Sequence, residues 1–345
     1  MADWRPDAAG PDASVLDDLV ARVIDSGAVS EVRRARLVTD GLQHIVVVLD
    51  EDLVARFPRS AQAIESLRGE ARLLTHLASR VSVPLPVPVH VDESFTLHRM
   101  LHGVVTSRRA LGSLERRARE RLLDDVGQFL AEVGTSAVPS FAASAAATSL
   151  DHMRVLRERA DRLVVPLLWN HQRQWLDELF AELEAVSFAH TPSLIHGDLA
   201  PYHLLHDHES GHLTGILDFG VAGLGDPATD LACLLSVWGE RFAGRLAHRW
   251  PAAFDLIDRA RLVAMALPLE WAVIALETNA ADMAVAHIGH LAVDVAPSAQ
   301  RSARPSDQRR RGGRNHRRRA ARSRRRCAVT VVRWIRYAPA LMVID

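Results

Sequence analysis

The first hundred residues combine an amphipathic helical pattern with runs of apolar, strand-forming residues. The helical pattern starts at Ser14, which forms a capping-box-like pair with Asp17, and stops at Gly27, a residue suited to a helix end. The apolar runs 44–49 and 53–57 flank a short acidic turn, so they predict a β-hairpin.

A second helix and a further strand follow the hairpin. Apolar residues at helical spacing predict a helix around residues 64–74. Pro84, Pro86 and Pro88 then exclude a helix and predict a crossing loop. The run 96–101 predicts one more strand.

From about residue 113 the pattern changes to helices that are interrupted by short strands. Helices are expected over 113–135, 151–164, 173–186 and from 227 to about 295. A loop is expected over 139–150, and strands over 193–195, 203–206 and 213–217. This order predicts an α+β fold with a small β-rich N-lobe and a larger, mainly helical C-lobe.

Composition places the chain among globular proteins. Of its 345 residues 48% are apolar, yet no apolar run reaches the roughly 20 residues that span a bilayer. The acidic N-terminus lacks the features of a signal peptide. Cys233 and Cys327 are the only cysteines and form no disulfide framework or metal-binding spacing, so we expect a cytoplasmic protein with no membrane partner.

Charge is distributed unevenly along the chain. All 42 basic residues are arginine, so any role that lysine usually fills must fall to arginine. Residues 301–345 hold 15 arginines and two acidic residues, which leaves 27 arginines against 40 acidic residues before them. An acidic body suits a cationic small-molecule substrate, although solubility alone also explains it.

The Arg-rich tail, residues 301–345, differs in kind from the rest. Its first part, 301–326, has 13 arginines and almost no apolar residues, so we expect it to be disordered. The alternative is an arm that binds nucleic acid or another anionic surface. No other nucleic-acid contact is expected.

Three polar motifs carry the candidate chemistry. They are His196-Gly-Asp198, with His203 five positions after the aspartate, then Gly-Ile-Leu-Asp218-Phe-Gly, and Gly-Asp-Pro-Ala-Thr-Asp230. In this order and spacing they resemble the aminoglycoside and macrolide phosphotransferases, which are relatives of protein kinases. The resemblance implies a bilobal protein-kinase-like fold that transfers the γ-phosphate of ATP or GTP to a hydroxyl group of a small molecule.

The resemblance covers roughly residues 30–300 and implies a division of the chain. The expected parts are an N-terminal helix segment (1–29), a nucleotide-binding N-lobe (30–103), a catalytic and substrate-binding C-lobe (104–300) and the Arg-rich tail.

The motifs imply roles for five residues. Asp198 would accept or orient the proton of the substrate hydroxyl, and Asp218 would hold Mg²⁺ at the nucleotide phosphates. His203 would contact the metal, a phosphate or Asp218, although imidazole is a poor Mg²⁺ ligand. His196 and Asp230 would brace the catalytic loop. Each of them also has a plain structural explanation as a turn or buried polar residue.

The N-lobe offers candidate nucleotide contacts. Arg56 follows a strand at the position of the phosphate-binding lysine of kinases, and Glu70, on the next helix, would pair with it. Gly41 would belong to the turn that covers the nucleotide, and Leu101 and Gly103 to the hinge beside the base. A surface Arg56 and Glu70 that never meet are the alternative.

Candidate substrate contacts lie on a late helix. Glu270 and Glu277 are seven residues apart and therefore share a helix face, where they would bind ammonium groups or simply be solvated. The leading hypothesis is an antibiotic kinase that confers resistance. A kinase of a small metabolite, a catalytically weak pseudokinase and a nucleic-acid-binding protein remain as alternatives.

Overall fold

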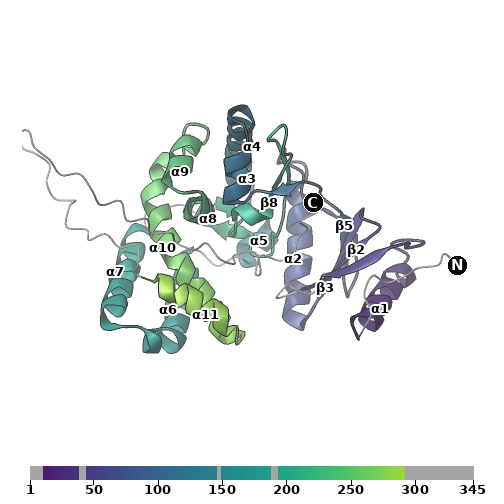
Figure 1. Ribbon diagram of the computed structural model, residues 1–345, viewed down its shortest axis with the longest axis horizontal. Coiled ribbons are helices and arrows are strands. Elements are labelled where there is room, and N and C mark those ends of the chain that lie inside the picture. The colour runs from purple at the N-terminus through teal and green to yellow at the C-terminus, as the bar shows by residue number, and fades with distance from the viewer. Residues whose placement is uncertain (1–10, 39–43, 146–148, 188–192, 292–345) are drawn as a thin grey trace, which may run out of the picture.

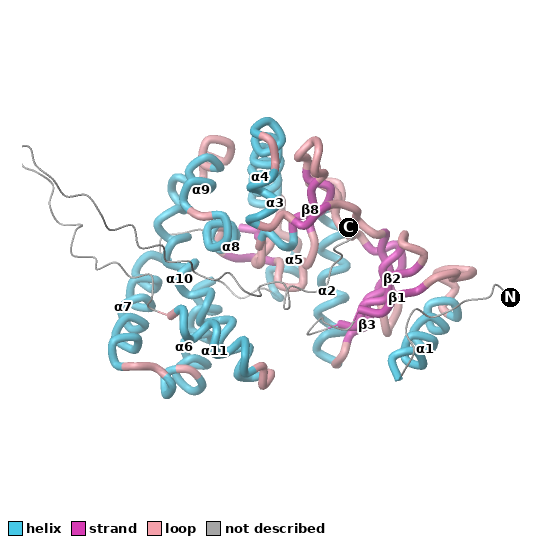
Figure 2. Tube along the Cα trace, in the orientation of Figure 1, coloured by secondary structure: helices cyan, strands magenta, loops and turns pink. Residues whose placement is uncertain are grey.

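The computed structural model describes residues 11–38, 44–145, 149–187 and 193–291, and these form two lobes (Figure 1). Gly41 and the Arg-rich tail lie outside the described residues. The smaller lobe holds a β-sheet with one helix on its outer side, and the larger lobe is mainly helical (Figure 2). The α+β fold with a small β-rich N-lobe and a helical C-lobe is confirmed.

The N-lobe sheet has five antiparallel strands in the order β1-β2-β3-β5-β4. Its strands are β1 (Ala35–Val38), β2 (His44–Leu49), β3 (Leu53–Pro58), β4 (Pro88–Val91) and β5 (Thr96–Arg99). The expected hairpin is present as β2 and β3. Asp50 and Glu51 in its turn have positive φ angles of 52° and 54°, the backbone that tight hairpin turns require.

The two faces of this sheet pack differently because successive side chains of a strand point to opposite sides. Val47, Leu49 and Phe57 join a core with α1 (Pro11–Asp25) on the outer side. The opposite face carries Val48 and Val54 and looks toward the rest of the molecule.

Helix α2 (Ala61–Leu77) connects the lobes. Ser60 caps its start by accepting a hydrogen bond from the amide of Ala63. Leu74 and Leu77 in its last turns belong to the large core of the C-lobe. The helix therefore lies between β3 and β4 in sequence but packs its C-terminal end against the other lobe.

The C-lobe is built around α8 and α10, which pack against each other and against the helices around them. Its helices are α3 (Arg108–Ser113), α4 (Arg116–Thr135), α5 (Ser140–Ala145), α6 (Ser149–Leu163), α7 (Asn170–Ser187), α8 (Ala228–Trp238), α9 (Glu240–Leu246), α10 (Ala253–Glu277) and α11 (Ala281–His290). Short 3₁₀ turns are η1 (Val165–Leu167) and η2 (Pro201–His203). Short strands are β6 (Val104–Val105), β7 (Ser193–Ile195), β8 (Leu204–His206), β9 (Leu213–Ile216) and β10 (Gly223–Gly225). They pair antiparallel as β6-β8-β9 and β10-β7.

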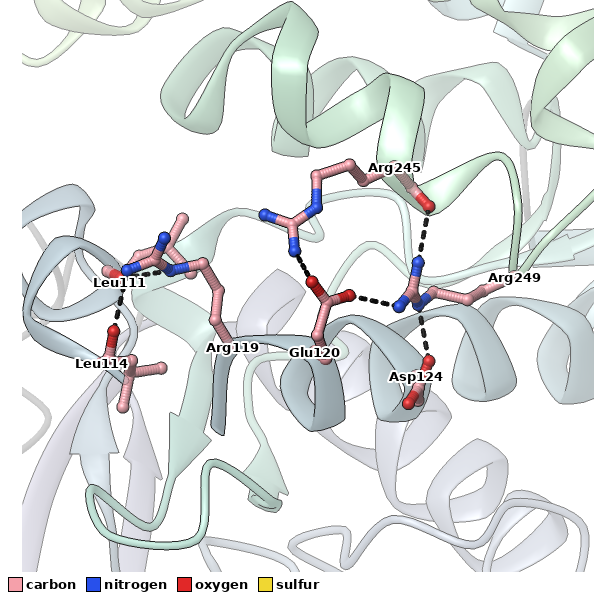
Figure 3. Close-up of polar contacts among 7 residues, drawn as sticks. All are labelled: Leu111, Leu114, Arg119, Glu120, Asp124, Arg245 and Arg249. Atoms are coloured by element: carbon pink, nitrogen blue, oxygen red, sulfur yellow. Dashed lines mark hydrogen bonds and ion pairs between the residues drawn. The ribbon is translucent and has the colours of Figure 1, made fainter. Parts of the chain in front are cut away.

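A charged cluster fixes α4 against the segment that contains α9 (Figure 3). Glu120 on α4 accepts hydrogen bonds from both Arg245 and Arg249. Arg249 Nε also lies 2.5 Å from Asp124 Oδ1, one turn further along α4. These side chains are partly exposed, and solvent-exposed ion pairs add little to stability. The cluster therefore orients α4 relative to the α9 segment more than it stabilises the fold.

Several expected boundaries in the first half are wrong. Strands β1 and β4 were missed, and β4 begins at Pro88, inside the expected loop, because an edge strand tolerates proline. The expected loop 139–150 contains α5, whose alanine-rich sequence favours helix without a clear apolar period. Helix α1 begins at Pro11 rather than Ser14, since proline suits a first helical turn.

In the second half, β10 was missed, and His203 lies in η2 rather than in the strand that follows. The last helix among the described residues, α11, ends at His290. None of the helices that the structure describes is long and apolar enough to cross a membrane.

Candidate functional site

The catalytic loop leaves β7 at His196 and returns to β8 through η2. Gly197 has a φ of 85°, and a Cβ atom there would lie 2.8 Å from the backbone oxygen of Val221. Only glycine fits this combination of left-handed backbone and close approach. The loop is thereby held against the segment between β9 and β10.

Asp230 on α8 fixes the start of this loop. Its carboxylate accepts hydrogen bonds from the amides of His196 at 2.9 Å and Gly197 at 2.7 Å. Burial raises the pKa of Asp230 to about 7, although both amide bonds act against the shift. A buried side chain with two backbone donors is a positioning group rather than a reacting one.

His196 is packed inside the loop. Its Nε2 lies 2.9 Å from the carbonyl oxygen of Leu217, and its Nδ1 accepts a hydrogen bond from the amide of Asp198 at 3.3 Å. Burial lowers the pKa of His196 to about 3, so the ring is neutral at pH 7. The structure places His196 and Asp230 where bracing residues are expected.

His203 lies between the two candidate catalytic carboxylates. Its Nδ1 is 2.8 Å from the backbone oxygen of Asp198 and 3.7 Å from the Asp198 Oδ2 atom. Its Nε2 is 3.5 Å from Oδ2 of Asp218. The His203 side chain is 2% exposed, whereas those of Asp198 and Asp218 are 34% and 38% exposed, so both carboxylates can be reached from outside.

The pKa values of the two carboxylates are shifted in opposite directions. Burial raises the pKa of Asp198, and this outweighs the opposite effect of His203. Burial also acts to raise the pKa of Asp218, but the charges of His203 and Arg56 reverse it and the net shift is downward. Asp218 therefore stays ionised, while Asp198 has a stronger affinity for a proton.

Asp218 has a strained backbone, with a φ of 62°. This left-handed conformation is uncommon for residues other than glycine, and strain of this kind concentrates at functional sites.

Arg56 and Glu70 meet in the cleft between the lobes. Arg56 Nη1 on β3 lies 2.6 Å from Glu70 Oε1 on α2, with side chains that are 15% and 2% exposed. Asp218 also acts on Arg56 through its charge. A neighbouring contact joins the same helix to the Asp218 loop, because Ser66 Oγ donates to the Gly220 carbonyl at 3.4 Å.

The segment between β5 and β6 connects the lobes on the other side of the cleft. A Cβ atom on Gly103 would lie 2.2 Å from Thr214 Oγ1, and one on Gly215 would lie 2.8 Å from Leu101 Cδ1. Leu101 and Gly103 are thus packed closely onto β9, which is compatible with the expected hinge.

The two acidic candidates on α10 have different surroundings. Glu270 Oε1 lies 2.9 Å from His152 Nε2 on α6, and its charge also acts on Asp198. Glu277 is held by Arg159, whose Nε lies 3.0 Å from Oε1. Glu270 thus interacts electrostatically with Asp198 and with both His152 and Arg159, whereas Glu277 pairs directly with Arg159.

Comparison with known proteins decides the family. The family model described as "Phosphotransferase enzyme family" (APH) matches residues 31–264. The chain belongs to this family.

Relatives of this phosphotransferase include the uncharacterized protein YcbJ of Bacillus subtilis (strain 168), 25% identical over 77% of this chain and 92% of that protein. Viomycin phosphotransferase of Streptomyces vinaceus is 32% identical, over 24% of this chain and 29% of its own length.

Solved structures of similar fold include the GDP and kanamycin complex of APH(2")-IIia. It has a TM-score of 0.73 and 25% identity, and covers 79% of this chain and 97% of that one. Macrolide 2'-phosphotransferase type I matches with a TM-score of 0.62 and 20% identity over 82% of this chain and 98% of its own, which shows the fold alone. The protein-kinase-like fold and the expectation of an O-phosphotransferase are thereby confirmed.

The residues of this phosphotransferase fit a Mg²⁺ ion at Asp218. The carboxylate stays ionised, and the buried Nε2 atom of His203 beside it makes no hydrogen bond to any described residue. Within the described ranges no group of three or more His, Cys, Asp or Glu side chains is arranged to hold a metal. An ion here would therefore need further oxygen ligands, such as those of nucleotide phosphates.

Sequence reasoning missed three long-range pairings of acidic residues. His152 and Arg159 come from α6, a helix with no motif of its own, and each pairs with an acidic residue of α10. Asp226, two residues before α8, accepts a hydrogen bond from the Ala228 amide and pairs with buried Arg259 on α10. No local signal indicates these long-range pairs.

Proposed function

We propose that this phosphotransferase moves the γ-phosphate of ATP or GTP onto a hydroxyl group of an amine-bearing small molecule. The first candidates are aminoglycoside and macrolide antibiotics, whose modification would confer resistance. Support comes from the likeness to the kanamycin complex and from the relation to viomycin phosphotransferase. We further propose a cytoplasmic location, which suits the buried free thiol of Cys233.

The observation that carries the proposal is the arrangement of charged groups around Asp198. Asp218 lies across the His203 ring from it and interacts through its charge with Arg56, which Glu70 holds, and the charge of Glu270 also acts on Asp198. A partly exposed carboxylate with a raised pKa, close to Asp218 and under the influence of Glu270, suits proton transfer during attack on a nucleotide.

The chemistry follows from this arrangement. The acceptor oxygen attacks the γ-phosphorus, the bond to the β–γ bridging oxygen breaks and the nucleoside diphosphate leaves. The hydroxyl proton passes to Asp198, whose raised pKa favours its acceptance. Mg²⁺, held by Asp218 with His203 beside it, would neutralise phosphate charge. Arg56, held by Glu70, would bind the phosphate chain.

Glu270 gives the substrate side its preference for a cation. In the structure its carboxylate contacts the imidazole of His152, and this hydrogen bond raises the pKa of His152 although burial acts against it. An ammonium group of a substrate would take the place of the imidazolium. Since Arg159 already neutralises Glu277, we assign the ammonium contact to Glu270.

The decisive experiment is phosphate transfer with purified protein, Mg²⁺ and either ATP or GTP. Aminoglycosides, macrolides and peptide antibiotics form one panel, and amino alcohols and sugars form a second. Addition of one phosphate to an antibiotic, read by mass and lost in Asp198→Ala, supports the proposal. Transfer only to the second panel would replace it with a metabolite kinase, and nucleotide binding without transfer would indicate a pseudokinase.

A further inference from the structure

His44 begins β2 on the cleft face of the N-lobe sheet. The register places Val46 opposite Arg56 and Val48 opposite Val54, and alternation puts His44 on the same face as these residues. The intervening residues of β2 face α1 instead. His44 is 9% exposed, so its imidazole is buried on the side of the sheet that carries Arg56.

The Nε2 atom of His44 lacks a hydrogen-bond partner among the residues that the structure describes, and it is buried. Buried polar atoms are almost always hydrogen-bonded in folded proteins, because an unpaired one loses its water without compensation. An orphaned ring nitrogen on a cleft face is therefore a site that a ligand atom can satisfy.

The charges around His44 define which ligand atom fits. The pKa of His44 is lowered to about 4, mainly by burial and next by the positive charge of Arg56. The charge of Arg59 lowers it further, whereas the charge of Asp218 acts to raise it. The ring is therefore neutral at pH 7. Arginine has no acceptor to offer a ring N–H, so an anionic oxygen drawn in by these arginines is the suitable partner.

We infer that His44 Nε2 donates a hydrogen bond to a phosphate oxygen of the bound nucleotide. The inference rests on the proposed function, which places the phosphate chain at Arg56. It requires the tautomer with the proton on Nε2. His44 then becomes a nucleotide-binding residue that no motif indicates.

His98 provides a matched comparison within the same sheet. It lies opposite Val54 on the same face, is buried, and has a pKa lowered to about 4, chiefly by burial. Unlike His44, it uses a ring nitrogen within the protein, because its Nδ1 lies 2.8 Å from the Arg99 carbonyl oxygen.

The test compares the affinities of the wild type, His44→Leu, His44→Gln and His98→Gln for ATP, GTP, adenosine and guanosine by calorimetry. Because the His44 ring is neutral at pH 7, leucine removes the donor without changing charge. We expect His44→Leu to bind the triphosphate about tenfold more weakly and the nucleoside unchanged. His44→Gln, which keeps an N–H donor, should recover most of this loss, and His98→Gln should not discriminate between the two ligands.

Two results would overturn the inference while leaving the proposed function in place. One is unchanged triphosphate binding in His44→Leu, with Arg56→Ala still weakening it. The other is an equal loss for nucleoside and triphosphate, which would mean that His44 only shapes the pocket. A wild type that binds neither ATP nor GTP would instead overturn the proposed function, and the inference with it.

A measurement on the wild type avoids any folding defect of the variants. The ¹⁵N resonance of His44 Nε2 should keep the protonated-nitrogen position and shift when ATP or GTP is added, but not with the nucleoside. No shift with either triphosphate, although it binds, would contradict the inference.

Discussion

Two carboxylates that are twenty positions apart in sequence, Asp198 and Asp218, lie on either side of one imidazole. The His203 side chain is almost fully buried, and its two ring nitrogens face the two carboxylates. Their pKa values move in opposite directions because Arg56 and His203 stabilise the ionised form of Asp218, whereas burial dominates at Asp198. At the residue scale the site therefore separates a proton acceptor from a charge-bearing ligand.

Replacement of Asp198 by asparagine should remove the proton acceptor without disturbing the loop. We expect kcat to fall by about 10²- to 10⁴-fold, the usual contribution of a general base. The affinity for ATP or GTP should stay unchanged, because Asp198 does not contact Arg56. Steady-state kinetics and calorimetry measure both, with Asp207→Asn in an exposed turn as the control. Undiminished kcat in Asp198→Asn would exclude this role.

The pair of His152 and Glu270 makes binding of an amine-bearing substrate dependent on pH. The pKa of His152 in the folded protein is raised, so its charged pair with Glu270 exists below that pKa and is lost as the pH rises through it. Asp198 and Arg159 are the other charged groups that act on this pair. We therefore expect the KM for an ammonium substrate to fall as the pH rises through the pKa of His152, because Glu270 is then no longer paired with a charged imidazolium.

Variants test this dependence. His152→Gln should flatten the KM profile, and Glu270→Gln should raise KM about tenfold with little change in kcat, as expected for loss of a charged hydrogen bond. Glu277→Gln, on the same helix but held by Arg159, is the matched control. An equal effect of Glu270→Gln and Glu277→Gln would argue against Glu270 as the specific contact.

At the scale of elements, the start of α8 is joined to α10 by a buried ion pair. Arg259 Nη2 lies 3.0 Å from Asp226 Oδ1, and both side chains are less than a tenth exposed. Since Asp230 one turn later holds the catalytic loop, this pair fixes the helix on which the loop depends.

The buried pair can be compared with an exposed one on the same helix. Arg259→Met leaves Asp226 buried without its cation, and we expect the free energy of unfolding to fall by about 3–5 kcal/mol. Arg261→Met, which removes exposed pairs with Glu240 and Asp258, should cost at most about 1 kcal/mol. Urea unfolding followed by circular dichroism measures both, and similar losses in the two variants would contradict this ranking.

At the scale of the whole molecule, the charged site residues that the structure describes lie within residues 44–291. Helix α2 and strand β3 supply the Arg56–Glu70 pair, the loop between β7 and β8 supplies Asp198 and His203, and α10 supplies Glu270. The acidic balance of the first 300 residues agrees with a substrate side that favours cations.

Removal of residues 301–345 should therefore leave phosphate transfer intact. We expect kcat/KM of the shortened protein to stay within about twofold of the full chain, since no proposed site residue is lost. If the full chain binds nucleic acid, that binding should weaken steeply with salt and disappear on removal of the tail. Loss of transfer in the shortened protein would show that the tail contributes to the enzyme.

Local signals determined a large part of this picture. The hairpin, the long helices and the motif around Asp198 follow from alternation, helical spacing and short-range turn chemistry, which neighbouring residues encode by themselves. The Arg56–Glu70 pairing was also predictable, because the two lie on consecutive elements whose relation the family resemblance supplies. The edge strand at Pro88 and helix α5 were not, since proline and alanine-rich stretches lack a clear period.

Only the tertiary structure decided what surrounds these groups. His152 meets Glu270, and Arg159 meets Glu277 from 118 positions away, because α6 packs against α10. The orphaned nitrogen of His44 depends likewise on which side of the sheet is covered by α1. The sequence thus determined which groups carry the chemistry. Long-range packing decided which of these charged groups pair with an opposite charge, and no local sequence pattern encodes such pairings.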